Sequence, residues 1–313
     1  MIDVIIPAYN AHNTIFQLLC SIGYQTIVDK VNVTIVNDNS SSDYSSFVDF
    51  FKNYFNISEL KNDVNCGPGV SRQIGIDSTN NPYIMFIDSD DCLSDCLSLE
   101  KLLCNIENSD YNVVGGKVVI QNECGFDVND EESVRLHGKM YRRKFLKDYN
   151  ISFGDFRYDE DNYFNSQIFL TGNDVYYLDS CVYIWRNIYS TSLSHSEYYS
   201  NNPLNSYVRS IIYAIEYGKD NNCNCVRIAD LTVSAFTYIY YFYLLYDINF
   251  DDIIIDLKAL AKYYNFYKNF LVKSDFINIV KKEFDVLHVR ENSKILCVQR
   301  IKFSDFIDMI LNY

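Results

Sequence analysis

Three carboxylates within four positions follow a short apolar run, and their types and spacing suit metal or phosphate chemistry. Residues 84–87 are apolar, lie behind Pro82 and predict a buried strand. Asp88, Asp90 and Asp91 follow directly. Because side chains alternate along a strand, we expect Asp88 and Asp90 to face one divalent cation, or one diphosphate bridged by it. Such oxygen ligands suit Mn²⁺ or Mg²⁺. Alternatively, the acids only cap a following helix.

A second acidic group, Asp159, Glu160 and Asp161, runs into a sequence with helical apolar spacing. Acids in the first turn of a helix are favoured by the helix dipole, so a solvated cap is the ordinary interpretation. A catalytic base is the alternative, because a positioned carboxylate can take a proton from a reacting hydroxyl.

Polar and glycine-rich turns lie between the predicted elements. Asp38 follows a β-branched strand, and residues 65–75 contain Gly67, Pro68 and Gly69 before a predicted helix. This loop either lets the backbone approach an anionic ligand or only ends a loop. It fits neither the dinucleotide fingerprint nor the P-loop, which weakens the dinucleotide and ATP interpretations.

Strands that alternate with helices in the first half predict an α/β fold with a Rossmann-like, mainly parallel sheet. Its carboxyl ends would bring Asp38 close to Asp88 and Asp90. The expected strands cover residues 4–6, 31–36, 83–87 and 113–120, and the expected helices include 15–22 and one that starts within 137–146.

Long helical patterns take over after about residue 200, so we expect a domain over residues 1–200 and a helical region over residues 201–313. Residues 231–246 predict a buried core helix and not a membrane span, since the run is short and contains Thr, Ser and many Tyr. The tail carries Lys281, Lys282 and Lys302 near apolar positions. A solvated helix face is the ordinary interpretation, and peripheral membrane contact is the alternative.

The chain has 313 residues and a formal net charge of −14, and it contains no long basic cluster. This composition argues against a general nucleic-acid binder, because neutralising phosphates requires a basic stripe. Ten cysteines occur without a secretory signal, so we expect reduced thiols and a cytoplasmic protein. The spacings Cys92/Cys96 and Cys223/Cys225 are unlike paired zinc knuckles, and no His pair lies nearby, so we expect no structural zinc.

Four segments carry a resemblance when they are taken in order. Residues 5–10, 36–40, 65–72 and 86–91, the last with a D-x-D pattern, resemble the family 2 glycosyltransferases of the GT-A fold. The resemblance is tight over the first ninety residues, continues weakly to about Ser194, and leaves the last third uncovered. It implies inverting, metal-dependent transfer of a single sugar from a nucleotide-sugar donor, by default a UDP-sugar, to a hydroxyl acceptor.

The resemblance also implies roles for individual residues. The donor would contact Pro7, Ala8, Tyr9, Asp38, Asn65, Gly67, Arg72, Asp88, Ser89, Arg186 and Ser192. Asp90, with Asp88, would bind Mn²⁺ or Mg²⁺, and His137 or His195 could complete the metal shell. Asp161 would be the catalytic base, with Glu160 and Asp159 as close competitors. Gln73 departs from the Asn that many relatives carry, which affects only the details of donor contact.

Several alternatives stay open at this stage. The acceptor could be a glycan, a lipid carrier, a protein or a modified nucleobase, and the helical region could bind the acceptor or form a homo-oligomer. A catalytically silent nucleotide-sugar-binding module is the competing class of protein. A nucleotidyltransferase fits less well, because residues 7–10 lack the glycine-rich basic loop that such an enzyme needs.

Overall fold

The structure is a computed structural model that describes residues 1–129, 135–188, 204–245, 250–251, 253–272, 275, 278–279 and 303–312. The chain forms two compact units. The first contains Met1–Ile168 and Asn173–Ser196, and the second contains Phe169–Gly172 and Glu197–Tyr313. Each unit is described by itself.

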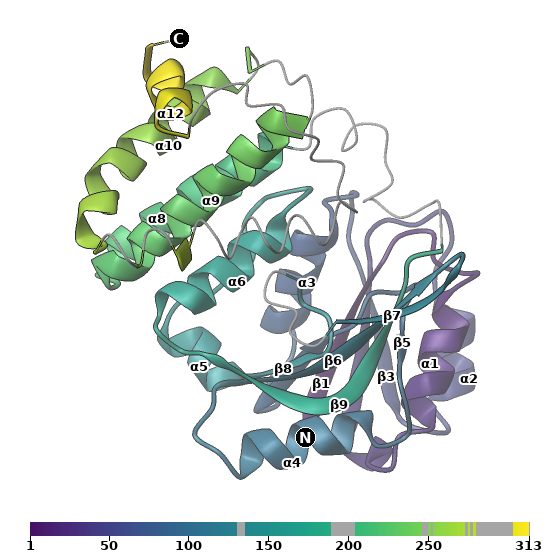
Figure 1. The fold of residues 1–313 in the computed structure, drawn as a ribbon. Helices are drawn as coiled ribbons and strands as arrows, with labels where there is room; N and C mark the ends of the chain where they lie inside the picture. Colours follow the sequence, from purple (N-terminus) through teal and green to yellow (C-terminus); the bar gives the residue numbers. More distant parts are fainter. Residues whose placement is uncertain are drawn as a thin grey trace. The chain divides into compact units, whose positions relative to one another are not determined.

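A mixed sheet forms the centre of the first unit (Figure 1). Its strands are β1 Ile2–Ala8, β2 Val31–Asn37, β3 Asn56–Lys61, β4 Tyr83–Phe86, β5 Cys92–Leu93, β6 Val113–Asn122, β7 Gly125–Asn129, β8 Lys139–Arg142 and β9 Val175–Arg186. The order is β3-β2-β1-β4-β8-β6-β9-β5, and β7 pairs with β6. Strands β1 to β4 are parallel, whereas β8 is antiparallel to both β4 and β6. The predicted α/β class is confirmed.

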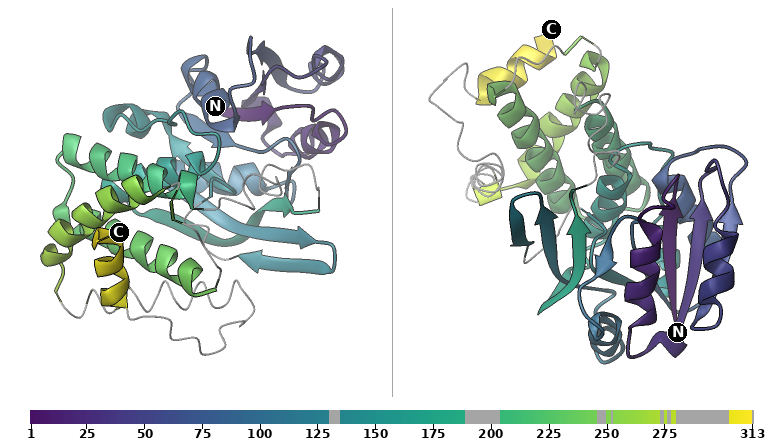
Figure 2. Two further views of the ribbon diagram at one scale, coloured as in Figure 1. Left: turned by 90° about the horizontal axis from the view of Figure 1, so that it is seen from above. Right: turned by 90° about the vertical axis from the view of Figure 1, so that its right-hand side faces the viewer.

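Helices flank this sheet in both views of Figure 2. They are α1 Ile15–Gly23, α2 Ser45–Phe51, α3 Pro68–Asp77, α4 Ser98–Glu107, α5 Arg143–Asp148 and α6 Glu160–Leu170, with a short 3₁₀ turn at Val28–Lys30. Helix α1 buries Ile15, Leu18, Leu19 and Ile22, the spacing of one helical face. The core places these side chains among the buried residues of β1 and β2, which fixes the strand ends that carry the polar turns.

One predicted helix begins later than expected. The helix expected within residues 137–146 starts only at Arg143, because residues 139–142 form strand β8. Lys139, Met140 and Tyr141 are fully buried there, and β8 fills the position between β4 and β6 in the sheet. A local sequence pattern cannot detect such a place in the sheet, since it depends on the partner strands.

The second unit is helical. It contains α8 Asn205–Asp220, α9 Cys225–Leu245, α10 Ile254–Tyr267 and α12 Phe303–Asn312, with a 3₁₀ turn at Lys268–Phe270. Helix α9 buries Val233, Phe236, Ile239 and Tyr241, which confirms the predicted core helix. Among the described residues, no helix combines the length and apolar character needed to cross a bilayer. Lys281, Lys282 and Lys302 lie outside the described part of the chain.

Candidate functional site

Asp38 lies immediately after β2 and holds the loop that precedes α3. Its carboxylate accepts hydrogen bonds from Asn62 Nδ2 (2.9 Å), Cys66 N (2.9 Å) and Gly67 N (2.8 Å), and the residue is 3% exposed. Burial by itself would raise the pKa of Asp38, but the hydrogen bonds from Cys66, Asn62 and Gly67 outweigh it and lower the pKa. The protein itself therefore uses both carboxylate oxygens of Asp38.

Arg72, on α3, joins the two acidic groups that the sequence analysis singled out. Its Nη2 donates to Asp88 Oδ1 (2.6 Å) and its Nη1 donates to Glu160 Oε1 (2.7 Å), while the Arg72 side chain is only 6% exposed. Burial by itself would lower the pKa of Arg72, but the carboxylates of Asp88 and Glu160 outweigh burial, so the pKa is raised. The guanidinium is therefore permanently charged and bridges two carboxylates that are 72 positions apart in the sequence.

A glycine allows α3 and α6 to meet at this bridge. A Cβ atom on Gly69 would lie 2.8 Å from Glu160 Cβ, which is closer than real side chains allow. The first turn of α3 thus contacts the first turn of α6, and Arg72 lies one turn further along α3. A larger residue at position 69 would push Glu160 away from Arg72.

The acids after β4 form a compact group with His137. Tyr183 Oη donates to Asp91 Oδ2 (2.6 Å), and Arg186 N donates to Asp91 Oδ1 (2.8 Å). His137 Nε2 lies 3.4 Å from Asp88 Oδ2 and 3.8 Å from Asp91 Oδ2. Ligand atoms of Asp88, Asp91 and His137 all lie within 4.8 Å of one another, which is the spacing of a possible metal site.

The strand that was predicted to lead directly into these acids ends one residue earlier than expected, so its alternation does not extend to them. Strand β4 ends at Phe86, and the backbone then turns, with Asp91 N donating to Asp88 O at 3.0 Å. The turn brings Asp88 and Asp91 together, because the period of two applies only within a strand. The sequence analysis gave Asp91 and Tyr183 no role, and no local signal could have paired them.

The electrostatics of this group favour a cation. Burial and the Asp88 carboxylate raise the pKa of Asp90, and burial raises the pKa of Asp91 to about 7. Burial would likewise raise the pKa of Asp88, but Arg72 and His137 outweigh it and lower the pKa. Burial would lower the pKa of His137, yet Asp88 and Asp91 outweigh burial and raise it. Its buried Nδ1 has no hydrogen-bond partner among the residues that the structure describes. These groups offer a divalent cation two carboxylates, an imidazole and a crowded negative charge.

The acids at the start of α6 are also perturbed. Asp159 has a φ of 59°, in the left-handed region that non-glycine residues rarely adopt. Burial and the neighbouring Asp161 raise the pKa of Glu160 to about 7, although Arg72 acts in the opposite direction. Burial raises the pKa of Asp161 as well, and Asp161 forms no ion pair among the residues that the structure describes. Among the described residues, Asp159 and Asp161 thus both lack an ion pair, whereas Glu160 is paired with Arg72.

The other predicted site residues lie at strand ends or in turns. Pro7 and Ala8 are buried at the end of β1, while Tyr9 is 55% exposed just beyond it. Ser89 lies in the turn after β4, and Asn65 Oδ1 accepts a hydrogen bond from Arg157 (3.3 Å). These residues surround the strand ends as Rossmann-like sheets require.

Arg186 ends β9 beside the acidic turn. Its Nε donates to the carbonyl oxygen of Asp90 at 2.5 Å, so its side chain reaches the turn that follows β4. Ser192 and His195 lie outside the described residues.

A family model and several curated relatives match this chain. Residues 3–158 match the family model for glycosyl transferase family 2. Poly(ribitol-phosphate) beta-N-acetylglucosaminyltransferase TarS of Staphylococcus aureus is 26% identical over 201 residues, which cover 58% of this chain and 35% of that protein. The uncharacterised glycosyltransferase EpsJ of Bacillus subtilis is 23% identical over 211 residues, which cover 59% of this chain and 61% of that protein. The match therefore spans less than two thirds of either relative.

Solved structures share the fold. The crystal structure of S. aureus TarS 1-349 in complex with UDP-GlcNAc has a TM-score of 0.69 at 19% identity and covers 84% of this chain and 81% of that one. Mannosyltransferase PcManGT from Pyrobaculum calidifontis, in complex with GDP-Man and Mn²⁺, has a TM-score of 0.55 at 12% identity, covering 90% and 86%. The predicted GT-A fold is confirmed.

Proposed function

Because this chain belongs to glycosyl transferase family 2, a family of enzymes, we propose that it transfers one sugar from a nucleotide-sugar donor to an acceptor hydroxyl with inversion. One observation carries the proposal beyond the family match. Arg72, whose side chain is 6% exposed, pairs with both Asp88 and Glu160 and links the acids after β4 to the start of α6, so the proposed donor-side and acceptor-side groups share one network. A UDP-sugar is the proposed donor, since a TarS structure in the same fold contains UDP-GlcNAc.

Asp161 is the proposed base. Inverting transfer needs one carboxylate to take the acceptor proton while the hydroxyl oxygen bonds to the anomeric carbon and the bond to the diphosphate breaks. Arg72 engages Glu160, whereas Asp161 keeps a carboxylate without an ion pair among the described residues. The raised pKa of Asp161 makes it a better proton acceptor than an ordinary aspartate.

A divalent cation, Mn²⁺ or Mg²⁺, is the proposed cofactor. Asp88, Asp91 and His137 supply a suitable donor set, and Asp90 is a further candidate ligand. Burial and Asp88 raise the pKa of Asp90, and a nearby cation would relieve this repulsion. When bound, the cation would offset the negative charge that develops on the leaving diphosphate.

The donor nucleotide would lie against the ends of β1 and β2. Pro7, Ala8 and Tyr9 line the first of these ends, and Asn65 and Gly67 lie in the loop that Asp38 holds. We assign Asp38 the task of shaping this loop, because its oxygens already accept hydrogen bonds from the protein.

The names of the relatives suggest an acceptor class. TarS acts on poly(ribitol-phosphate), and another relative, GgaA of B. subtilis, is named a minor teichoic acid biosynthesis protein and is 28% identical over 194 residues. We therefore propose a phosphate-bearing glycan or alditol polymer as the acceptor.

The test measures donor binding and hydrolysis with UDP-GlcNAc, UDP-glucose and GDP-mannose in the presence of Mn²⁺, Mg²⁺ or EDTA. The single tryptophan, Trp185, lies 5.5 Å from His137 between ring centroids, so its fluorescence reports on the site. We expect Mn²⁺ to quench it, one donor to be hydrolysed, and EDTA to abolish both effects.

Asp90→Ala should weaken metal-dependent donor binding by about tenfold or more, since it removes one proposed ligand. Asp155→Ala changes an exposed acid in the loop before α6 and should behave as wild type. If no nucleotide sugar binds in a metal-dependent manner, the proposed function is wrong.

A further inference from the structure

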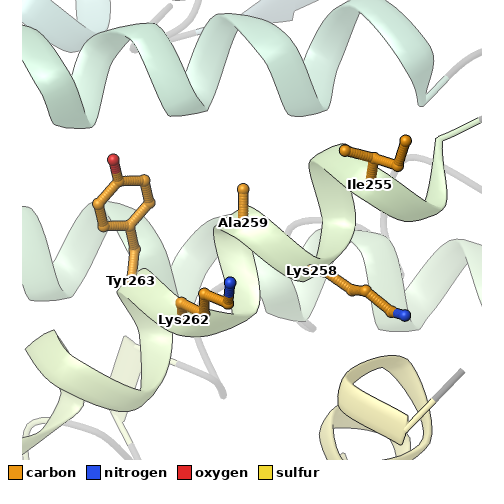
Figure 3. A pocket seen from close by; sticks show the side chains of 5 residues that line it. All are labelled: Ile255, Lys258, Ala259, Lys262 and Tyr263. Carbon is orange, nitrogen blue, oxygen red and sulfur yellow. The ribbon is translucent and has the colours of Figure 1, made fainter.

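Helix α10 of the second unit carries a pocket with unusual chemistry. Ile255, Lys258, Ala259, Lys262 and Tyr263 line a pocket of about 450 Å³ (Figure 3). Their spacing of three and four residues places them on one face of the helix. Ile255 is exposed although it is apolar, so the face combines an apolar strip with two lysine side chains.

The two lysines of this face lack a polar partner in the described part of the chain. Lys258 and Lys262 make no ion pair or hydrogen bond with any residue that the structure describes. Two other exposed lysines have partners and serve for comparison, Lys52 with Asp49 (2.6 Å) and Lys144 with Asp148 (2.5 Å). In a chain of net charge −14, Lys258 and Lys262 place two positive charges one turn apart on one helix face.

Neighbouring charges do not neutralise this face. The nearest acid along the helix, Asp256, is engaged by Arg209 Nε at 2.9 Å. A third lysine, Lys219 of α8, lies with its Nζ 5.2 Å from the centroid of the Tyr263 ring. Glu216 is the one acid within reach of the Tyr263 hydroxyl among the described residues, at 3.5 Å. The local balance is therefore positive.

We propose that this α10 face, with Lys219, is a binding site for the phosphates of an anionic acceptor chain. This inference rests on the proposed function, because it assigns a place to the acceptor class named there. Lysines bind phosphate oxygens as mobile point charges, which suits a flexible repeating polymer better than one fixed ligand. The Tyr263 ring and Ile255 offer an apolar surface to the carbon skeleton between phosphates.

The charge pattern favours a soluble polyanion over a membrane surface. An interfacial helix needs a wide apolar face with aromatic or leucine anchors. The pocket lining combines Lys258 and Lys262 with only one large aliphatic side chain, Ile255, which is 81% exposed. An open cationic face fits a phosphate-bearing chain that lies along it.

The test measures binding of fluorescently labelled inorganic polyphosphate to the full chain by anisotropy at low salt. We expect wild type to bind and Lys258→Gln/Lys262→Gln to bind about tenfold more weakly, since each exposed cation contributes modestly. Added salt should weaken binding to wild type.

The matched control is Lys52→Gln/Lys144→Gln, which removes the same charge from lysines that are already paired. This control should bind within about twofold of wild type, because the net charge changes equally in both double variants. Circular dichroism should show unchanged helix content in both.

Three outcomes would overturn the proposal: no polyphosphate binding by wild type, equal weakening in both double variants, or binding only to phosphatidylglycerol vesicles. The third would indicate a membrane surface. Donor hydrolysis by wild type tests the proposed function separately. Its absence with every nucleotide sugar would reject that function, while the polyphosphate comparison would still report on the α10 face.

Discussion

Two regions of this protein hold charge in opposite ways. In the first unit, acids crowd around the strand ends and α6, and the protein itself holds them through Arg72, Tyr183 and backbone N–H groups. In the second unit, lysines of the α10 face stand without partners among the described residues. Buried charges must be paired or hydrogen-bonded inside the fold, whereas exposed charges are solvated by water and stay available to bind a ligand. Substitutions should therefore affect stability in the first region and binding in the second.

The largest effect is expected at the unpaired acid of α6. Asp161→Asn keeps the shape of the side chain but removes the proton acceptor, so kcat should fall by about 10² to 10⁴ while donor binding persists. The wild-type rate should also fall at acidic pH, since the base must be deprotonated and its pKa is raised. Steady-state kinetics with donor titrations would measure both. If Glu160→Gln loses kcat by this factor while Asp161→Asn stays active, Glu160 and not Asp161 is the base.

Breaking the buried bridge should be the next largest effect. Arg72→Met leaves Asp88 and Glu160 without their cation and should cost about 3–5 kcal/mol of unfolding free energy. Lys144→Met breaks the exposed pair with Asp148 and should cost less than about 1 kcal/mol. Urea unfolding followed by Trp185 fluorescence reports on the first unit in both variants. If both variants lose the same unfolding free energy, the Arg72 ion pairs stabilise the fold no more than an exposed pair does.

The pH dependence of stability should sharpen the contrast. Burial and Asp161 raise the pKa of folded Glu160 to about 7, so its protonated form favours folding, and this contribution is lost as pH rises from about 4.5 through 7. Metal-free wild type should lose stability over this interval. Glu160→Gln cannot titrate, so its loss should be smaller by roughly 1–3 kcal/mol. Trp185 urea midpoints between pH 5 and 8 measure the slopes, and parallel slopes would contradict the assignment.

The smallest effect on stability is expected on α10. Lys258→Gln/Lys262→Gln should lower the free energy of unfolding by less than about 0.5 kcal/mol and change the thermal midpoint little, because neither lysine has an ion pair or hydrogen bond with a described residue. Thermal unfolding followed by far-ultraviolet circular dichroism measures this. A larger loss would mean that the lysines support the helix packing.

Much of the fold could be predicted because it is written in local patterns. The apolar, β-branched strands β1, β2 and β4 and the apolar face of α1 each carry their own periodicity. Strand β8 was not predicted, because its formation depends on pairing with β4 and β6. Strand β9 was not predicted either, because its pairing with β6 includes a register shift that interrupts alternation.

The amino-acid sequence by itself determined which polar turns follow which strands, and hence that Asp38, Asp88 and the α6 acids are the candidate groups. Only the tertiary structure decided their partners. It paired Asp88 with Arg72 and brought Asp91 beside Asp88 and His137. It also paired Glu160 with Arg72 and left Asp161 without an ion pair to any described residue. The reason is physical: strand ends follow from short-range apolar periodicity, but hydrogen bonds between residues far apart in sequence depend on how turns and helix starts meet in space.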